Sequence, residues 1–309
     1  MPGQPGSIHL FQVAGIHVFL HWTWFLVALF EIGNRAAHYR SLAWNVLEYL
    51  ALFMIVLLHE FGHALACRQV GGKANRIVLW PLGGIAYVDP PRRPGAMLWS
   101  ISAGPLVNVA LLVLVIALTM ASGVAGSSLA LPDLQKFLDA LVIINLVLLV
   151  FNLLPIYPLD GGQILRSLLW FVMGPDRSLL AVTFVGFGGV ALLAALALWT
   201  RNVWLGIMAL FILLNCSQAW SRARLSLRLA KLSRREGYVC PSCGVKPPLG
   251  SQWICSNCRT RFDPFETQTA CPKCRLQFPA IRCLDCGTSH PMSAWPAPAL
   301  SPIPTSRIP

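Results

Sequence analysis

The stretch His59-Glu60-Phe61-Gly62-His63 lies inside the apolar run from Val46 to Cys67, where charged side chains are ordinarily excluded. On a helix, histidines four residues apart project from the same face and can share one zinc ion. Glu60 lies beside them and can take a proton from the water that such a zinc activates. A carboxylate at membrane depth costs about 3 kcal/mol, so an intramembrane cluster of this kind indicates a function. The stretch therefore predicts a membrane-spanning helix that carries hydrolytic zinc chemistry.

The composition of the chain is that of a multispanning membrane protein. Of its 309 residues, 56% are hydrophobic and only 12% are charged, and the mean hydropathy is +0.62. Stretches near the roughly 20 residues that cross a bilayer occur at 16–34, 44–67, 97–122, 138–172, 179–199 and 203–220. The stretch 138–172 is too long for one straight helix. We expect an all-α polytopic domain of about six transmembrane helices.

Lys and Arg are distributed unevenly between the predicted loops. They are sparse at 35–43, 123–137 and 200–202. On the opposite side of the membrane they are frequent, at Arg68, Lys73, Arg76, Arg92, Arg93, Arg177, Arg222, Arg224, Arg228, Lys231, Arg234 and Arg235. The positive-inside rule makes this basic side cytoplasmic, which places both termini in the cytoplasm if the chain crosses six times. The lack of eukaryotic sorting signals favours a bacterial inner membrane.

The net charge of +12 does not by itself indicate nucleic-acid binding. The basic cluster 222–235 directly follows the last predicted span, where anionic lipid headgroups are the expected partner. Changes in composition then divide the chain into parts. We expect a membrane domain at 1–220, a basic juxtamembrane linker at 221–236, a cysteine-rich module at 237–290 and a disordered Pro-rich tail at 291–309.

A short apolar segment between the second and third predicted spans has a different character. It runs from Arg76 to Asp89, is rich in β-branched residues and surrounds the pair Gly83-Gly84. It is too short to cross a bilayer. A membrane-associated β-hairpin that dips in from the cytoplasmic side fits this pattern, if protein shields its backbone or it lines a wet cavity. An interfacial loop is the alternative, and the sequence does not decide between them.

The fourth apolar stretch contains a candidate third ligand, which a catalytic zinc needs beside its open position. In Asn152-Leu-Leu-Pro155-Ile-Tyr-Pro158-Leu-Asp160-Gly161-Gly162, the prolines break helical hydrogen bonds and the glycines permit close backbone approach. Asp160 can therefore project from an irregular segment into a cavity. Taken alone, Asp160 could equally cap a second half-helix at 161–172. Taken with the two histidines, the ligand interpretation is the stronger one.

Three motifs make the chain resemble the site-2 protease family of intramembrane zinc metalloproteases. They are His59-Glu60-Phe61-Gly62-His63, Ala103-Gly104-Pro105-Leu106-Val107-Asn108, and the Asn152 segment that ends in Leu159-Asp160-Gly161. Their order and spacing match the family, and Pro81-Leu-Gly-Gly84 also resembles a family element. The resemblance covers residues 8–220. It implies that His59, His63 and Asp160 bind one catalytic zinc and that Glu60 is the general base.

The resemblance also implies how substrate is held and cut. Asn108 and Asn152 would hydrogen-bond the substrate backbone or the oxyanion, although a packing role between spans is at least as well supported. Gly83 and Gly84 lie in the hairpin. They would help an unwound substrate segment to pair with the hairpin as an additional β-strand. The implied reaction is cleavage of single-span membrane proteins near the cytoplasmic side, as in regulated intramembrane proteolysis.

Eight of the ten cysteines form Cys-x-x-Cys pairs, namely Cys240/Cys243, Cys255/Cys258, Cys271/Cys274 and Cys283/Cys286. Each pair resembles a zinc-ribbon knuckle, and consecutive pairs would hold two structural zinc ions in sites of four thiolates. An interleaved pairing, first with third and second with fourth, stays open. Disulfides are the alternative, but the predicted cytoplasmic side is reducing. We expect this double zinc ribbon to dock a protein partner rather than nucleic acid.

Two other classes of function compete with the enzyme. A noncatalytic membrane scaffold or receptor would act through the zinc ribbons, but it would be expected to lose ligands that this chain retains. A metal transporter could use the same intramembrane ligands, but it should carry several ionisable residues along a path, whereas the predicted spans carry essentially one cluster. We therefore expect a zinc-dependent intramembrane endopeptidase with a cytoplasmic double zinc-ribbon module.

Overall fold

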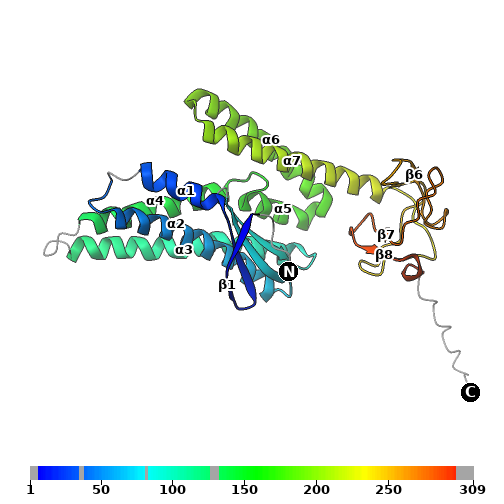
Figure 1. The fold of residues 1–309 in the computed structure, drawn as a ribbon, viewed down its shortest axis with the longest axis horizontal. Helices are drawn as coiled ribbons and strands as arrows, with labels where there is room; N and C mark the ends of the chain where they lie inside the picture. Colours follow the sequence, from blue (N-terminus) through cyan, green and yellow to red (C-terminus); the bar gives the residue numbers. More distant parts are fainter. Residues whose placement is uncertain (1–5, 35–37, 81–82, 126–131, 297–309) are drawn as a thin grey trace, which may run out of the picture. The chain divides into compact units, whose positions relative to one another are not determined.

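The computed structural model describes residues 6–34, 38–80, 83–125 and 132–296. The chain folds as two compact units, Met1–Trp220 and Ser221–Pro309. The first unit combines long helices with a four-stranded sheet, and the second contains small hairpins (Figure 1).

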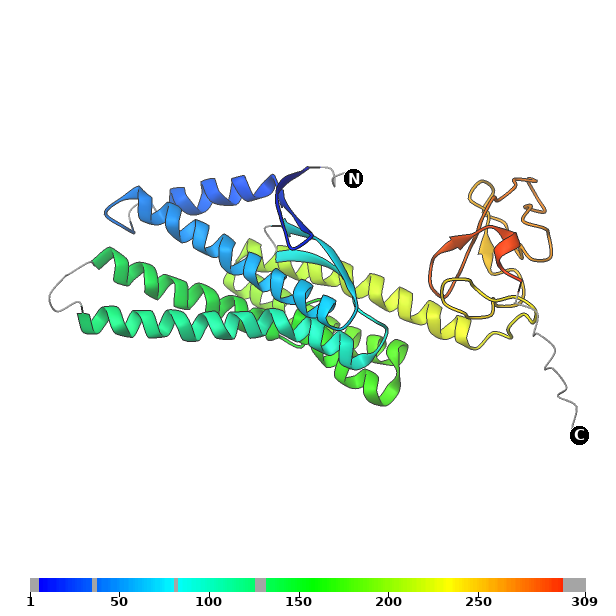
Figure 2. The ribbon, with the colours of Figure 1, turned by 90° about the horizontal axis from the view of Figure 1, so that it is seen from below.

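Long apolar helices build most of the first unit. Within the described residues, five helices are long and apolar enough to cross a membrane. They are α2 (Leu42–Gln69), α3 (Pro94–Ala125), α4 (Pro132–Leu153), α6 (Pro175–Thr200) and α7 (Val203–Ala230). α2 packs along α3, and α3 packs along α4 (Figure 2). Large exposed apolar side chains on these helices, such as Val113, Val147 and Leu192, suit contact with lipid.

A four-stranded sheet packs against α2. Its strands, in spatial order, are β1 (Ser7–Val13), β2 (Ile16–His21), β3 (Lys73–Trp80) and β4 (Gly83–Asp89). β2 runs parallel to β3, and the other neighbours are antiparallel. Ile77 and Leu79 of β3 are fully buried and share a core with Leu57 and Ala64 of α2. β3 and β4 form the hairpin expected around Arg76–Asp89, and residues 81–82 lie outside the described part.

The stretch 16–34, expected as the first transmembrane helix, is instead a strand followed by a short helix. β2 precedes α1 (Thr23–Asn34), whose 12 residues extend about 18 Å, less than the roughly 30 Å hydrocarbon core. Ile16 and Val18 face the α2 core and alternate with His17, which is the period of a strand with one covered face. The prediction of a helix here was wrong, because β2 pairs with β3 and extends the expected hairpin into a sheet.

The stretch 138–172 breaks, as expected, between α4 and α5 (Asp160–Met173). A Cβ atom at Gly161 would lie 2.2 Å from the carbonyl oxygen of Leu153, and one at Gly162 would lie 2.4 Å from the backbone nitrogen of Tyr157. Only glycine fits where the chain approaches itself this closely. The tight connection places Asp160 at the first residue of α5, while Leu159 occupies the N-cap position without a capping side-chain bond.

The second unit contains two small hairpins around an apolar core. β5 (Trp253–Ile254) pairs with β6 (Arg261–Phe262), and β7 (Ile281–Arg282) pairs with β8 (Ser289–His290). The buried core includes Phe262, Phe265 and Ile281 together with cysteines of all the Cys-x-x-Cys pairs. The last described element is a 3-10 helix, Met292–Ala294.

The cysteine-rich module extends further along the chain than the predicted boundary at residue 290. Trp295 is fully buried in its core, and the Val239 N–H donates to the Trp295 carbonyl oxygen at 2.8 Å. Burial of a large indole ties residues 291–296 to the module, so the predicted start of a disordered tail at 291 was wrong. Residues 297–309 lie outside the described part.

Candidate metal centres

Three ligand-type side chains meet among the helices of the first unit. His59 and His63 of α2 have their Nε2 atoms 3.0 Å apart. Oδ2 of Asp160 lies 3.0 Å from Nε2 of His59 and 3.3 Å from Nε2 of His63. Both histidines are buried. The structure thus brings together the three residues that the sequence predicts as ligands of one metal ion.

This set of donors fits zinc. Ligand atoms around a tetrahedral zinc lie about 3.3 Å apart when each bond is about 2.0 Å long, and the separations here run from 3.0 to 3.3 Å. Imidazole nitrogen and carboxylate oxygen are both common zinc ligands. Three protein ligands leave one coordination position open, which is the arrangement of catalytic rather than structural zinc.

The second ring nitrogen of each histidine is held by α3. Nδ1 of His63 donates to the Ser100 carbonyl oxygen at 2.9 Å, and Nδ1 of His59 donates to Oδ1 of Asn108 at 3.1 Å. With Nδ1 protonated, each Nε2 lone pair is directed toward the common centre. Ser100 could not be predicted from the sequence, because it acts through a backbone carbonyl that every residue type offers.

Gly104 of α3 makes room for the two imidazole rings. A Cβ atom at this position would lie 2.4 Å from Nε2 of His63 and 2.8 Å from Cε1 of His59. We predict that Gly104→Ala displaces the rings and weakens zinc binding in the first unit at least about tenfold, as loss of ligand positioning does elsewhere. Gly95→Ala on the same helix is the matched control, because its Cβ would meet only Phe171 Cζ at 3.8 Å. Equal zinc affinity of the two variants in a chelator competition would contradict the prediction.

Asn108 touches a predicted ligand rather than an open site. It is almost fully buried at 1% exposure, and its Oδ1 accepts the bond from His59. Its carbonyl oxygen accepts a second bond from Nδ2 of Asn145 on α4, at 2.8 Å. Asn145 was not predicted from the sequence, since a single asparagine in an apolar helix shows no partner. The observed contacts make Asn108 a residue that orients His59.

The zinc affinity of Asn108 variants distinguishes the orientation of His59 from direct contact with substrate. Asn108→Leu removes the acceptor for His59 Nδ1, so we expect zinc affinity in the first unit to fall about 10- to 100-fold. Asn108→Asp keeps an acceptor oxygen and should retain most of the affinity. Unchanged zinc affinity in Asn108→Leu, combined with lost activity, would instead assign Asn108 to the substrate or oxyanion.

The remaining residues expected to bind substrate lie on two other elements. Asn152 is half-buried in the last turn of α4. Gly83 and Gly84 begin β4, in register with Trp80 and Leu79. No hydrogen bond of the Asn152 side chain is recorded among the described residues. The part of these three residues in substrate binding stays a prediction.

Comparison with known proteins agrees with this geometry. A sequence profile described as Peptidase family M50 matches residues 48–129 and 119–196, which include both histidines, Asn108 and Asp160. The membrane unit is therefore similar to family M50 across the segment that contains these residues. The matched profile and the five apolar helices indicate a multi-pass integral membrane protein.

Several similar proteins are named as zinc metalloproteases. This chain is 32% identical over 214 residues to a zinc metalloprotease of Methanocaldococcus jannaschii. The aligned segment covers 69% of this chain and 60% of the relative. It is also 32% identical over 155 residues to stage IV sporulation protein FB of Bacillus subtilis, covering 48% of this chain and 45% of that protein. The chain therefore spans less than two thirds of either relative.

A solved structure is similar to the membrane unit in fold. The site-2 protease from Methanocaldococcus jannaschii matches with a TM-score of 0.51 and 28% sequence identity, covering 69% of this chain and 95% of the other. The M50 profile ends at residue 196, before the Cys-x-x-Cys pairs begin, so the profile gives no information about the cysteine module.

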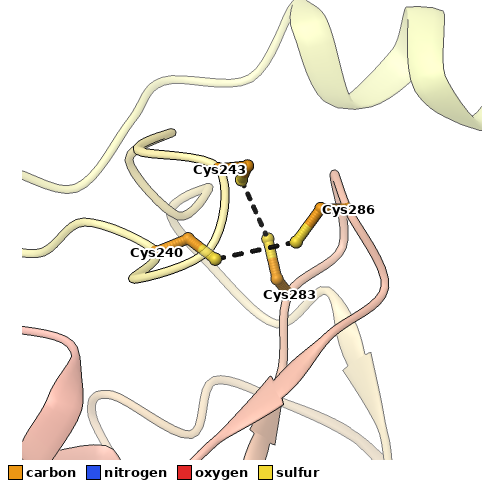
Figure 3. A group of neighbouring side chains, drawn as sticks. All are labelled: Cys240, Cys243, Cys283 and Cys286. Carbon is orange, nitrogen blue, oxygen red and sulfur yellow. Dashed lines mark hydrogen bonds between the residues drawn. The ribbon is translucent and has the colours of Figure 1, made fainter. Parts of the chain in front are cut away.

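The cysteines of the second unit form two groups of four. Cys240, Cys243, Cys283 and Cys286 make one group (Figure 3). Cys255, Cys258, Cys271 and Cys274 make the other. Recorded sulfur–sulfur distances run from 3.5 to 3.9 Å, near the about 3.8 Å between thiolates on a tetrahedral zinc and far above the roughly 2.05 Å of a disulfide. The geometry therefore fits two metal sites, which we call the outer and the inner cysteine site respectively.

The cysteine pairs are nested. The first pair meets the fourth, and the second meets the third, so the predicted consecutive pairing was wrong and the interleaved alternative is not adopted either. The two ends of the module explain this arrangement. Tyr238 and Pro296 form an isolated β-bridge, which brings the start and the end of the module together and with them the outermost pairs.

Hydrogen bonds favour the thiolate form of one cysteine in each site. The Thr260 hydroxyl and backbone N–H lower the pKa of Cys258 to about 6. Burial opposes ionisation of Cys286, but hydrogen bonds from Thr288 outweigh it and lower the pKa of Cys286 to about 6. Zinc binds the thiolate and not the thiol, so both sulfurs are suited to act as ligands at neutral pH.

Nested pairing predicts which double substitutions remove one zinc and which remove two. Cys243→Ser with Cys286→Ser damages only the outer site, so we expect the loss of about one zinc per chain. Cys243→Ser with Cys258→Ser damages both sites and should remove about two. Metal analysis of the purified chains measures the difference. The reverse result would support consecutive pairing and overturn the nested arrangement.

Proposed function

We propose that this protein is a zinc-dependent intramembrane endopeptidase that cleaves single-span membrane proteins near the cytoplasmic side. The observation that carries the proposal is the cluster of His59, His63 and Asp160, whose ligand atoms lie 3.0 to 3.3 Å apart. Both histidines lie in the apolar helix α2, and all three residues fall within the segment that matches the M50 profile. Glu60 is buried next to it, with 5% of its surface exposed.

The chemistry follows from the roles of these side chains. When bound, zinc supplies a Lewis acid that polarises a peptide carbonyl and makes water more acidic. Glu60 accepts the proton of the attacking water and delivers a proton to the departing amine. Asn108 and the Ser100 carbonyl hold the histidine rings in place through their Nδ1 atoms. Burial keeps bulk water away from the reacting groups and strengthens their electrostatic interactions.

The position of the cluster along α2 supports cleavage toward one membrane face. His59 lies ten residues before the end of α2 at Gln69, which is about 15 Å along a helix. Basic residues, among them Arg68 and Lys73, follow at this end, and the positive-inside rule assigns them to the cytoplasm. β1 and β2 belong to the same sheet as β3, which begins at Lys73. We infer that both termini are cytoplasmic, in a bacterial inner membrane.

A helical substrate must unwind locally before its peptide bonds can be cut, because its carbonyls are already hydrogen-bonded. β4 is the last strand of the sheet order and pairs only with β3 among the described strands. Its outer edge therefore has backbone donors and acceptors for an extended substrate segment. Gly83 and Gly84 at the start of β4 would allow that segment to approach closely.

Cleavage of purified substrates tests the proposal. The full chain would be reconstituted in proteoliposomes with single-span substrates whose cytoplasmic half carries helix-destabilising Gly and Pro, and with matched all-Leu spans. We expect cleavage of the first set, its loss with a zinc chelator, and its recovery on adding zinc. Cleavage that resists chelation would contradict the mechanism. A folded, zinc-loaded chain that cuts no substrate would favour a noncatalytic scaffold that acts through its zinc ribbons.

A further inference from the structure

We propose that the inner cysteine site carries a surface that binds the anionic phospholipid headgroups of the membrane. This surface, the knuckle face, consists of Ile254, Arg259, Arg261, Lys273, Arg275 and Leu276. All six side chains are exposed. The inference depends on the proposed cytoplasmic location of the module and not on proteolysis.

The positive charge of the knuckle face is not neutralised within its own unit. The acidic residues in Ser221–Pro309 are Glu236, Asp263, Glu266 and Asp285. Each of them forms an ion pair elsewhere, with Arg234, Arg235 or Lys246. Among the described residues, no ion pair is recorded for the four cations of the knuckle face. Within the described part of the unit, these four cations are thus available to pair with an anionic partner.

The two arginines next to the inner site occupy positions that suit glycine. The residue after the second cysteine of each pair has a positive φ, +69° at Gly244 and +79° at Gly287 in the outer site, but +57° at Arg259 and +59° at Arg275 in the inner site. In all four turns its N–H donates to the carbonyl of the first cysteine of the pair, at 2.8 to 3.0 Å. An L-residue with a side chain is strained in this conformation. Arginine here is therefore not explained by the needs of the turn.

Apolar side chains accompany the cations. Ile254 is 59% exposed and Leu276 is 39% exposed. Ile254 is in register with Arg261, so both side chains lie on the same face of the β5–β6 hairpin, while Trp253 and Phe262 are buried on the other face. Leu276 directly follows Arg275. Exposed aliphatic groups flanked by cations are typical of surfaces that lie in the membrane interface.

The connection to the last membrane helix favours lipid over other anionic partners. Only residues 231–236 separate the end of α7 from the start of the cysteine module. So short a tether keeps the module at a high effective concentration near the bilayer, and the cytoplasmic leaflet is negatively charged. An acidic protein or a nucleic acid would satisfy the charges, but a bilayer also offers an apolar region for Ile254 and Leu276.

Hydrogen exchange of the full chain in lipid nanodiscs tests this inference. Discs would contain phosphatidylcholine alone or with about 30% phosphatidylglycerol, which supplies the negative surface. We expect amides at 253–262 and 271–278 to be protected more strongly in the anionic discs. In Arg259→Gly with Arg275→Gly this lipid-dependent protection should fall about thirtyfold, since each cation near an anionic surface contributes about a factor of five. Glycine suits the positive φ, so the variant should keep its zinc content.

A matched control removes the same charge elsewhere in the unit. Lys246→Gln with Arg282→Gln takes away two exposed cations outside the knuckle face and should keep the lipid-dependent protection. The inference is overturned if the wild type shows no dependence on phosphatidylglycerol or if the double glycine variant retains it. Protection in neutral discs by an added acidic peptide or single-stranded RNA, without a response to phosphatidylglycerol, would assign the face to that partner instead. These readouts do not depend on whether the first unit cleaves any substrate.

Discussion

Glu60→Gln should abolish proteolysis while the zinc in the first unit stays bound. Glutamine has the shape of glutamate but cannot accept the proton of the attacking water, and the ligands His59, His63 and Asp160 are untouched. Loss of a general base ordinarily lowers a rate about 10²- to 10⁴-fold. We expect a decrease in this range in the rate at which substrate fragments form in proteoliposomes. Metal analysis of the same sample should show an unchanged zinc content.

The matched control for this change lies on the same helix. Glu48 is buried in α2 and accepts a hydrogen bond from the Tyr39 hydroxyl at 2.5 Å. Glu48→Gln makes the same chemical change about 18 Å away along the helix and keeps an acceptor oxygen. It should leave the cleavage rate within a small factor of wild type. Near-normal turnover of Glu60→Gln would show that another group acts as the base.

Asp160→Asn should remove both the zinc of the first unit and the cleavage activity. The carboxylate supplies one of three protein ligands and the only negative charge among them, whereas a neutral amide oxygen binds zinc poorly. We expect zinc affinity in the first unit to fall by more than the about 10- to 100-fold that loss of an outer hydrogen bond costs. Total zinc should drop from about three to about two ions per chain, because the outer and inner cysteine sites remain.

Asp139→Asn on α4 is the corresponding control. Asp139 accepts a bond from Gln135 at 3.2 Å, so the substitution makes the same change in a membrane helix without touching the metal cluster. It should retain zinc and activity. If Asp160→Asn kept its full zinc content, Asp160 would only stabilise the first turn of α5. Another residue would then have to be the third zinc ligand. The N-cap of α5 is Leu159 and not Asp160, which weighs against a capping role for Asp160.

The clustering of His59, His63 and Asp160 could be predicted because their signals are local. The spacing of His59 and His63 has meaning only on a helix, and the apolar run around them predicts that helix directly. Asp160 follows prolines and precedes glycines, which mark a break in a helix whatever lies around it. Each signal depends on a few neighbouring residues, so it can be recognised without knowledge of the fold.

The first strands of the sheet could not be predicted in the same way. A buried strand and a membrane helix are both apolar, so the stretch 16–34 is ambiguous by composition. What makes Ile16–His21 a strand is its pairing with β3, a segment far away in the sequence. The nested cysteine pairs have the same origin, since four identical Cys-x-x-Cys motifs contain no information about which two will meet.

Residue type and local spacing were thus enough to predict that His59, His63 and Asp160 share one site, that Glu60 is the base and that the cysteines bind metal. Packing between distant elements determined the other features of the site and of the cysteine module. It placed the Ser100 carbonyl and Asn108 against the histidines, opened space for the rings at Gly104, and joined the first cysteine pair to the fourth. The physical reason is that such contacts depend on how whole helices and strands pack, and they leave no periodic pattern in the chain.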